Sequence, residues 1–215
     1  MIAFLSTLLC IHFMDPMVLK DSEPLSAEIS KQWRDALMPD GIAVSTSGKQ
    51  RIVLHPVRSL RVTAENEQLA NGLTPECLTI GSLLGCITFD KAWTDFRNQT
   101  VPAGSYALRY ALQPVTDDHA DTAPSRHFAL LVPMGTEPGT VPSQDVLFKQ
   151  SISVNSKHPA VLPVLEGRKN NGRGIQKLEA NCWAVSLEIP AVAEQKQTTL
   201  YLRLIIAGKS QAAQP

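Results

Sequence analysis

Apolar and polar residues alternate along much of the chain after Gly41 with a period of two, the spacing that places one side of a β-strand against a core. Turn-forming Gly, Pro, Asn and Asp residues separate these stretches. Such segments cover residues 42–54, 57–63, 78–89, 105–113, 127–132, 159–165, 183–189 and 199–207. They predict about eight to ten short strands. Because no helical segments alternate with them, the sequence predicts a mainly β domain, an antiparallel β-sandwich or a barrel-like sheet.

A short N-terminal helix is predicted just before these strands. Ile29, Trp33 and Leu37 recur at the spacing of one helix face. Ser26 is the expected N-cap, and the turn residues 39–41 end the segment. Residues 133–150 contain several Pro and Gly residues and are predicted as a surface loop.

The clearest alternation predicts a pair of neighbouring strands joined by the polar loop 113–127. On the first strand, one buried face is expected to carry Tyr106, Leu108, Tyr110 and Leu112, and Arg109 is expected to point to the other face. Phe128, Leu130 and Val132 are expected to face them from the second strand.

The first residues have the character of an export signal. Residues 2–13 form an apolar run that is shorter than the ~20 residues needed to span a bilayer and that fits the core of a signal peptide. No Lys or Arg precedes the run and no clear cleavage site follows it, so a buried first strand is the alternative. Leu8 and Leu9 precede Cys10 where a lipoprotein signal has small residues, so no lipid anchor is predicted. We expect a leader over residues 1–27, a single mainly β domain over 28–208, a frayed tail over 209–215, and a periplasmic or extracellular location.

The charge balance and the cysteines limit the classes of protein to which the chain can belong. Lys and Arg together number 20, as do Asp and Glu, so the basic surplus of a nucleic-acid-binding protein is lacking. Three cysteines, Cys77, Cys86 and Cys182, follow the N-terminal segment. Two interpretations are open: Cys77 and Cys86 form a disulfide in an oxidising compartment, or all three are free, buried and apolar in character. Their spacing matches no zinc-binding pattern.

Two segments, residues 93–131 and the later KHPAVL at 157–162, resemble segments of a group of bacterial proteins. The stretch WTDFRNQTVPAGSYALRYALQPVTDDHADTAPSRHFALL resembles a group of exported bacterial proteins with the pattern aWtDyRgq-vpaGtYtLRYalqP-dgdH-g-aP-rdFlLL-P and a later HPaVl segment. The group has no established activity, so the resemblance implies only export and a β fold. This chain departs from the pattern after His119, where Ala120 and Asp121 stand in place of the usual Gly. That departure puts a tight ligand-binding loop in doubt.

One loop concentrates acidic, imidazole and guanidinium groups, and it is the only site that the sequence suggests. A divalent metal ion is the implied cofactor, because carboxylates favour calcium and imidazoles favour zinc or copper. The candidate metal ligands are Asp117, Asp118, His119, Asp121 and His127. Arg126 and His158 are the candidate ligand-binding residues, and the site is expected at the sheet end formed by the 113–127 loop. The alternative is an ordinary turn, since Asp is common in turns for its own backbone hydrogen bonds.

The convergence of His119, His127 and either His55 or His158 would favour the metal site. No GxSxG or phosphate-loop motif occurs, so the sequence identifies no catalytic residues. The aromatic residues Trp93, Phe96, Tyr106 and Tyr110 either line a sugar- or peptide-binding face or pack in the core. The sequence therefore favours an exported, non-enzymatic binding or structural protein of unknown ligand. A metal-binding protein or metal-dependent enzyme that uses the 117–127 loop is the alternative.

Overall fold

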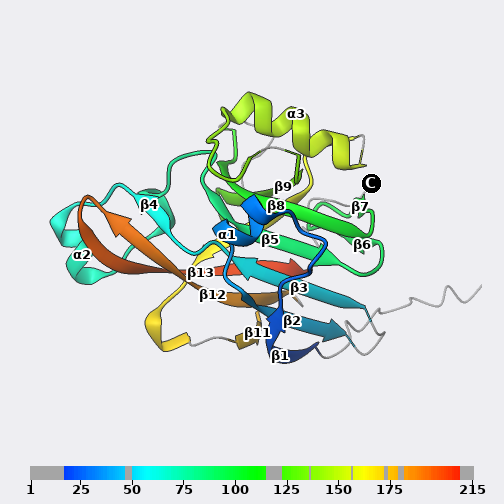
Figure 1. The fold of residues 1–215 in the computed structure, drawn as a ribbon, viewed down its shortest axis with the longest axis horizontal. Helices are drawn as coiled ribbons and strands as arrows, with labels where there is room; N and C mark the ends of the chain where they lie inside the picture. Colours follow the sequence, from blue (N-terminus) through cyan, green and yellow to red (C-terminus); the bar gives the residue numbers. More distant parts are fainter. Residues whose placement is uncertain are drawn as a thin grey trace, which may run out of the picture.

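The chain folds into a mainly β structure with three short α-helices among its described residues (Figure 1). A computed structural model describes residues 17–46, 50–114, 123–135, 137–155, 157–171, 174–178 and 182–208. The strands are β1 (Met17–Pro24), β2 (Asp40–Thr46), β3 (Arg51–Pro56), β4 (Leu60–Val62), β5 (Leu83–Phe89), β6 (Trp93–Thr94), β7 (Thr100–Val101), β8 (Gly104–Leu112), β9 (His127–Pro133), β10 (Val161–Glu166), β11 (Gly174–Lys177), β12 (Trp183–Ala193) and β13 (Lys196–Ala207). The helices are α1 (Lys31–Ala36), α2 (Asn66–Asn71) and α3 (Gln144–Asn155), with 3₁₀ turns η1 (Pro75–Cys77) and η3 (Lys169–Asn171).

The strands form one curled sheet that resembles a half-barrel. Its order is β1-β2-β3-β5-β8-β9-β10-β13-β12-β11, and β6 and β7 form a separate small hairpin. The mainly β prediction is confirmed, but a sandwich of two facing sheets is not, because β10 pairs with both β9 and β13 and joins the two halves. The edge strands β1 and β11 approach each other, which brings the sheet close to closure.

The face of the sheet that lies inside the curl carries the main hydrophobic core. Paired residues share a face, and the register places Leu108 opposite Leu131 and Tyr110 opposite Ala129 on this inner face. The predicted strand pair and the outward direction of Arg109 are confirmed. The residues predicted to face this strand are wrong by one position. Leu130 lies opposite Arg109 on the outer face and does not face the tyrosines. Phe128 and Val132 likewise share the outer face with alanines of β8.

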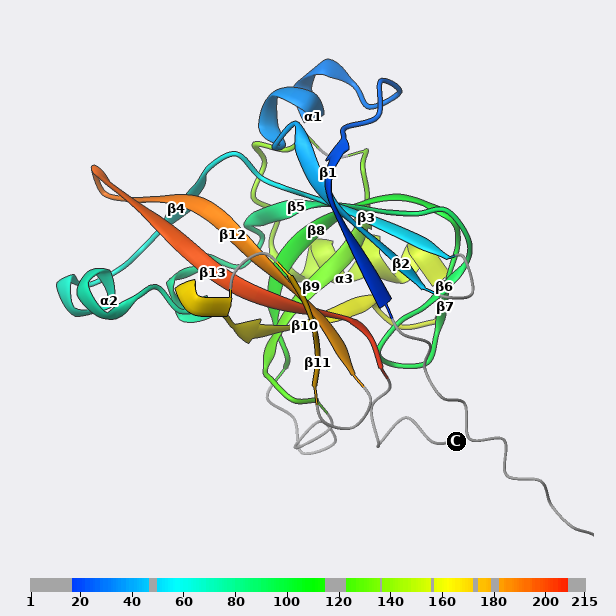
Figure 2. The same ribbon diagram turned by 90° about the horizontal axis from the view of Figure 1, so that it is seen from below.

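The long hairpin of β12 and β13 extends past the rest of the sheet toward α2 (Figure 2). Near its tip β12 pairs with β4, and this pairing is parallel. Such a contact was not predicted, since the alternating pattern indicates strands but not which distant strands are neighbours.

The sheet begins earlier than the predicted domain boundary at residue 28. Residues 17–24, assigned to the leader, form β1 and pair antiparallel with β2. The expectation that everything before residue 28 lies outside the β core is therefore wrong for β1. The apolar run itself lies outside the described residues.

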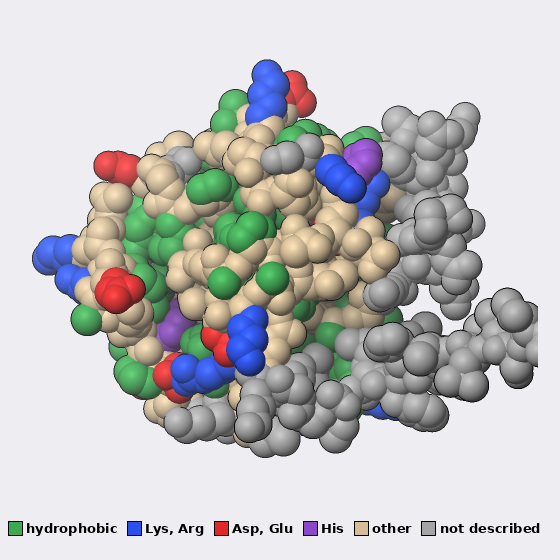
Figure 3. All heavy atoms as spheres, turned by 90° about the vertical axis from the view of Figure 1, so that its right-hand side faces the viewer, with side chains coloured by type: hydrophobic (Ala, Val, Ile, Leu, Met, Phe, Trp, Pro, Cys, Tyr) green, Lys and Arg blue, Asp and Glu red, His purple; other side chains and the backbone are tan. Residues whose placement is uncertain are grey.

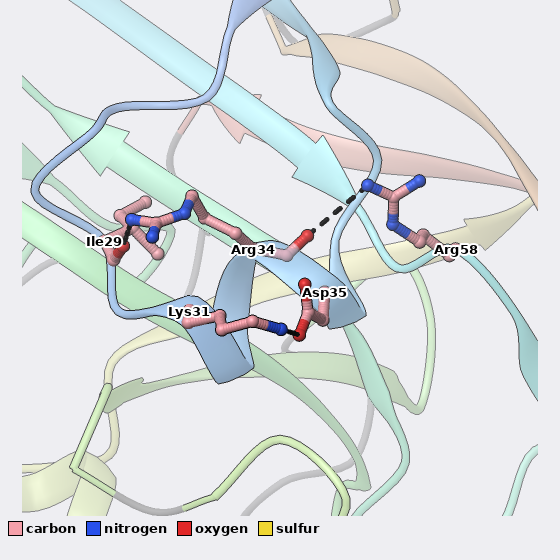
Figure 4. A network of polar contacts seen from close by, with 5 residues as sticks. All are labelled: Ile29, Lys31, Arg34, Asp35 and Arg58. Atoms are coloured by element: carbon pink, nitrogen blue, oxygen red, sulfur yellow. Dashed lines mark hydrogen bonds and ion pairs between the residues drawn. The ribbon is translucent and has the colours of Figure 1, made fainter.

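The predicted N-terminal helix exists, but it starts later than expected. Ser30 is at the N-cap position of α1 and its side chain makes no capping bond, while the Ser26 hydroxyl accepts a hydrogen bond from the Glu28 N–H at 3.3 Å. Ser26 thus forms a local turn instead of capping a helix. Arg34 donates back to the Ile29 carbonyl, and Arg58 donates to the Arg34 carbonyl at 3.4 Å, so arginines bind the carbonyls before and within α1 (Figure 4).

Helix α3 occupies the last part of the predicted surface loop and continues beyond it. It packs on the outer face of β9, and its contacts extend to β7 (Figure 1). Leu147 is fully buried, and the Ser151 hydroxyl donates to the Ala160 carbonyl at 3.1 Å. The sequence did not predict this helix because its apolar residues, in QDVLFKQSISVN, follow no clear helical spacing. Within the described part of the chain, no helix combines the length and apolar character that a membrane crossing requires.

Candidate functional site

A chain of three hydrogen-bonded side chains lies at the sheet end where the 113–127 loop was predicted to form a site. The Tyr110 hydroxyl on β8 lies 2.7 Å from His127 Nδ1 on β9. His127 Nε2 lies 3.0 Å from a carboxylate oxygen of Glu76 in η1. Tyr110 and His127 are buried, while the Glu76 side chain is 61% exposed. The chain therefore links a buried phenol to the protein surface.

The protonation of this chain follows from its partners. Burial would raise the pKa of Glu76, but hydrogen bonds from Thr74, its own backbone and His127 lower it overall, so Glu76 is ionised and only accepts. His127 Nε2 must then carry a proton and donate to Glu76. Burial, with the nearby charge of Glu76, raises the pKa of Tyr110 to about 12, so the phenol keeps its proton and donates to Nδ1.

In this arrangement hydrogen bonds occupy the imidazole and the phenol. Both nitrogens of His127 are engaged, one by Tyr110 and one by Glu76. Tyr110 is 1% exposed, so its hydroxyl does not reach a ligand in solution. A metal ion would bind His127 only by taking Nε2 away from Glu76.

The remaining residues of the predicted site are only partly described. Asp117, Asp118, His119 and Asp121 lie outside the described residues. Arg126 is exposed, and its main-chain carbonyl accepts a hydrogen bond from the Gln113 N–H at 2.8 Å. This bond closes the base of the β8–β9 hairpin.

His158 is not at the predicted sheet end. Val161 pairs with Leu130, and the Leu131 N–H donates to the Ala160 carbonyl. The residues before Val161 therefore run toward Pro133, at one end of β9. His127 is at the other end of β9, about 20 Å away along a strand of this length. The prediction that His158 lies close to the 113–127 loop is wrong.

His55 does not converge with His127 either. It lies on β3, and the strands β5 and β8 stand between β3 and β9. His55 is 3% exposed, its Nδ1 lies 3.2 Å from the Met38 carbonyl, and burial lowers its pKa. It is a packing residue beside Gly41, whose missing side chain makes room for the imidazole ring.

A second polar cluster lies where the two segments of the resemblance meet. Asp95 is fully buried, and both of its carboxylate oxygens accept hydrogen bonds. The donors are the N–H groups of Arg97 at 3.0 Å, Gln99 at 2.8 Å and Val161 at 3.4 Å, and the Gln99 side-chain amide at 3.0 Å. Burial raises the pKa of Asp95, while these hydrogen bonds act to lower it.

Gln99 extends this cluster to the later HPAVL segment. Its side-chain carbonyl accepts the His158 N–H at 3.2 Å, and its amide donates to the Pro159 carbonyl at 3.4 Å. The WTDFRNQ and HPAVL segments are therefore in direct contact through Asp95 and Gln99. We call the contact between these residues the Asp95 latch.

The four candidate aromatic residues and the three cysteines after the N-terminal segment are buried in the core. Trp93, Phe96, Tyr106 and Tyr110 are all at most 9% exposed, so they do not line an open sugar- or peptide-binding face. Trp93 stacks on Phe89 with ring centroids 4.7 Å apart and donates from its indole nitrogen to the Ile206 carbonyl at 3.0 Å. Cys77 and Cys86 are free thiols and do not form a disulfide with each other, and all three cysteines are buried. Burial raises the pKa of the Cys86 thiol to about 12.

Sequence reasoning missed Glu76 and the role of Gln99. Glu76 follows a proline in a polar loop, and no spacing connects it with His127, which is 51 positions later. A signal existed for Asp95, because Asp is common at the start of turns, where its carboxylate binds the following N–H groups.

Comparisons with protein-family models, with curated proteins and with solved structures give no match. Within the described residues, no three His, Cys, Asp or Glu side chains lie close enough to hold a metal ion. On the face drawn in Figure 3, acidic and basic side chains are interspersed and gather into no large area of one sign.

Proposed function

We propose that the protein is an exported, non-enzymatic binding or structural domain built on a barrel-like β scaffold. The observation that carries this proposal is the Asp95 latch. Two polar residues of the resembling segments are engaged in holding the fold, since Asp95 accepts from three main-chain N–H groups and Gln99 bonds to two residues of the HPAVL segment. Residues that serve main-chain hydrogen bonds in this way are not available for chemistry on a substrate.

The test is the stability of latch variants, because catalytic and structural residues respond differently. Replacing a catalytic residue commonly leaves stability unchanged or raises it, whereas replacing a structural one lowers it. We expect Asp95→Ala to reduce the free energy of unfolding by about 2–4 kcal/mol, because it leaves buried N–H groups without an acceptor. Asp35→Ala, at an exposed carboxylate on α1, is the control and should have no measurable effect. An Asp95→Ala protein as stable as the parent in urea unfolding contradicts the proposal.

Export is the second component, and it rests on the apolar run at residues 2–13 and on the resemblance. The full chain is fused at its C-terminus to a reporter enzyme that is active only when its disulfides form outside the bacterial cytoplasm. We expect reporter activity with the parent, and its loss when Leu8 and Leu9 are both replaced by Arg. Equal activity from the two fusions, or none from the parent, contradicts export.

Metal binding by the 117–127 loop is the second candidate function. The observation that favours it is Glu76, which adds a carboxylate beside His127 at the base of that loop. Metal content is measured in untagged protein purified without chelator and in the double variant Asp118→Ala/His119→Ala. Metal in the parent and none in the variant supports this function. Equal content in both, or none in either, leaves the loop as a turn.

A further inference from the structure

Arg109 is a buried cation without a carboxylate partner among the described residues. Its side chain is 1% exposed, and it points to the outer face of β8. Desolvation is the cause that lowers its pKa, and no acidic neighbour offsets it. A buried charge held only by neutral groups is costly, because carbonyl dipoles replace water less well than a counter-charge does.

Most of the carbonyls that hold Arg109 belong to residues 137–143, which we call the strap. Nη1 donates to the carbonyls of Gly81 at 3.1 Å and Thr140 at 2.5 Å. Nη2 donates to the carbonyls of Glu137 at 3.0 Å and Pro138 at 3.4 Å. Nε is buried and has no partner. The edge of the guanidinium formed by Nε and Nη2 is therefore the less satisfied edge, and it is one that a carboxylate can bind with two parallel hydrogen bonds.

The strap itself is weakly attached. None of its residues is buried, and Val141 is 58% exposed. The strap also approaches Gly81, in the turn before β5, where a Cβ would lie 2.5 Å from the Pro142 carbonyl oxygen. Because it buries no side chain, the strap can leave Arg109 without opening the hydrophobic core.

The outer face of the sheet is apolar around Arg109. Ala107 and Ala111 flank it along β8, and Leu130 lies opposite it on β9, the strand on which α3 packs. All three are at most 2% exposed. The neighbours of the cation on its own strand are therefore small and apolar.

We propose that Arg109 is a binding site for an organic carboxylate with an apolar body, covered by the strap when no ligand is bound. The carboxylate takes the Nε and Nη2 edge and displaces the carbonyls of Glu137 and Pro138, while Nη1 keeps its bond to Gly81. The apolar body lies beside Ala107 and Ala111 on β8. This inference specifies the ligand of the proposed binding role and rests on it.

The probe is benzoate, and benzamide is the uncharged control of the same shape. The full chain, labelled with ¹⁵N at arginine, is titrated with each, and the Arg109 Nε–H signal is identified by its absence from Arg109→Lys. We expect benzoate to shift this signal downfield in a saturable manner and benzamide to leave it unmoved. An unmoved signal with benzoate, or the same shift with benzamide, overturns the inference.

Two variants test the roles of the guanidinium and the strap. Arg109→Lys keeps a charge but loses the two-pronged geometry, so its affinity for benzoate should fall at least about tenfold, while the control Arg61→Lys, exposed on β4, should keep it. If Arg109→Lys does not fold, Gly139→Ala serves instead, since nothing lies within 4 Å of a Cβ there. It stiffens the strap and should weaken binding about two- to fivefold. Unchanged affinity in Gly139→Ala means that the strap does not cover the site. The two tests are independent of each other. If benzoate does not bind the parent but Asp95→Ala is destabilised, this site is rejected and the proposed function is kept.

Discussion

Single polar residues in this protein hold segments that are distant along the chain. Asp95 binds a hairpin to β10, Trp93 donates to the carbonyl of Ile206 on β13, and Tyr110 connects through His127 to Glu76. Each of these residues is buried except Glu76. Buried polar groups of this kind are satisfied by their partners, so the removal of one partner has a cost that depends on what remains unpaired.

The hydroxyl of Tyr110 makes the free energy of unfolding depend on pH in the alkaline range. Its pKa is raised from about 10 in the unfolded chain to about 12 in the folded protein. The folded state thus holds this proton more tightly, and its contribution to stability is complete below pH 10 and is lost as the pH rises through 12. We expect Tyr110→Phe to be less stable by about 1–2 kcal/mol at neutral pH, because His127 Nδ1 loses its donor.

The same variant should lose part of the alkaline decline in stability that the parent shows. The check is urea unfolding of the parent and of Tyr110→Phe at several pH values between 8 and 12. Tyr201→Phe, at a half-buried position on β13, is the matched control for loss of a phenol. A parallel decline of parent and Tyr110→Phe across this range would contradict the assignment of the hydrogen bond.

At the scale of elements, most long strands and the pairing of β8 with β9 were predictable, but the pairings between strands far apart in the sequence were not. Alternation identified β8, β9, β12 and β13 because each has a side that packs in the core. It could not place Arg109 opposite Leu130, since a register is set by pairing and a shift of one residue exchanges the faces. The pairing of β4 with β12 and the contact of Glu76 with His127 arise only from the folded chain.

Helix α3 is held on the sheet by its buried side, and the effect of that side can be measured. Leu147 is fully buried, whereas its neighbour Val146 is 45% exposed. Leu147→Ala should lower the free energy of unfolding by about 2–4 kcal/mol, because it leaves a cavity between α3 and the sheet. Val146→Ala should change it by less than about 0.5 kcal/mol. Thermal unfolding of both variants provides the comparison, and equal effects would show that α3 does not pack as described.

Strand β1 is part of the sheet although it lies within the predicted leader. Leu19 pairs with Val44 and packs against the core. Leu19→Pro should lower the melting temperature, because proline removes an N–H and fixes the backbone, whereas Leu19→Val suits a strand and should have little effect. Deleting residues 1–27 should also expose the edge of β2 and promote association, which size-exclusion chromatography would detect. A Leu19→Pro protein that melts like the parent would contradict the pairing of β1.

At the scale of the whole molecule, the order of strands in the sheet differs from their order in the sequence in one important place. From β1 to β10 the strands mostly follow each other, but the last strand, β13, lies between β10 and β12. It also contributes buried residues to the main core, Leu200, Leu202 and Leu204 among them. The sheet is therefore continuous only when the C-terminal strand is present.

A chain that ends at Ala193 should not unfold cooperatively, because β12 loses the strand that connects it to β10 and the main core loses the buried side chains of β13. A chain that ends at Gly208 keeps β13 and is the matched control. Circular dichroism during heating distinguishes them, with a sharp transition expected only for the longer chain. A cooperative transition in the shorter chain would contradict the central position of β13.

The place of β13 has a consequence for the timing of folding during synthesis. Ribosomes make the chain from its N-terminus, so β13, which connects β10 to β12, is made after the other strands of the sheet. Pairings across long sequence separations also form slowly. The newly made chain consequently remains incompletely folded until β13 has been made. Such a delay suits the export that we propose, because the chain reaches a narrow translocation channel before its structure is complete.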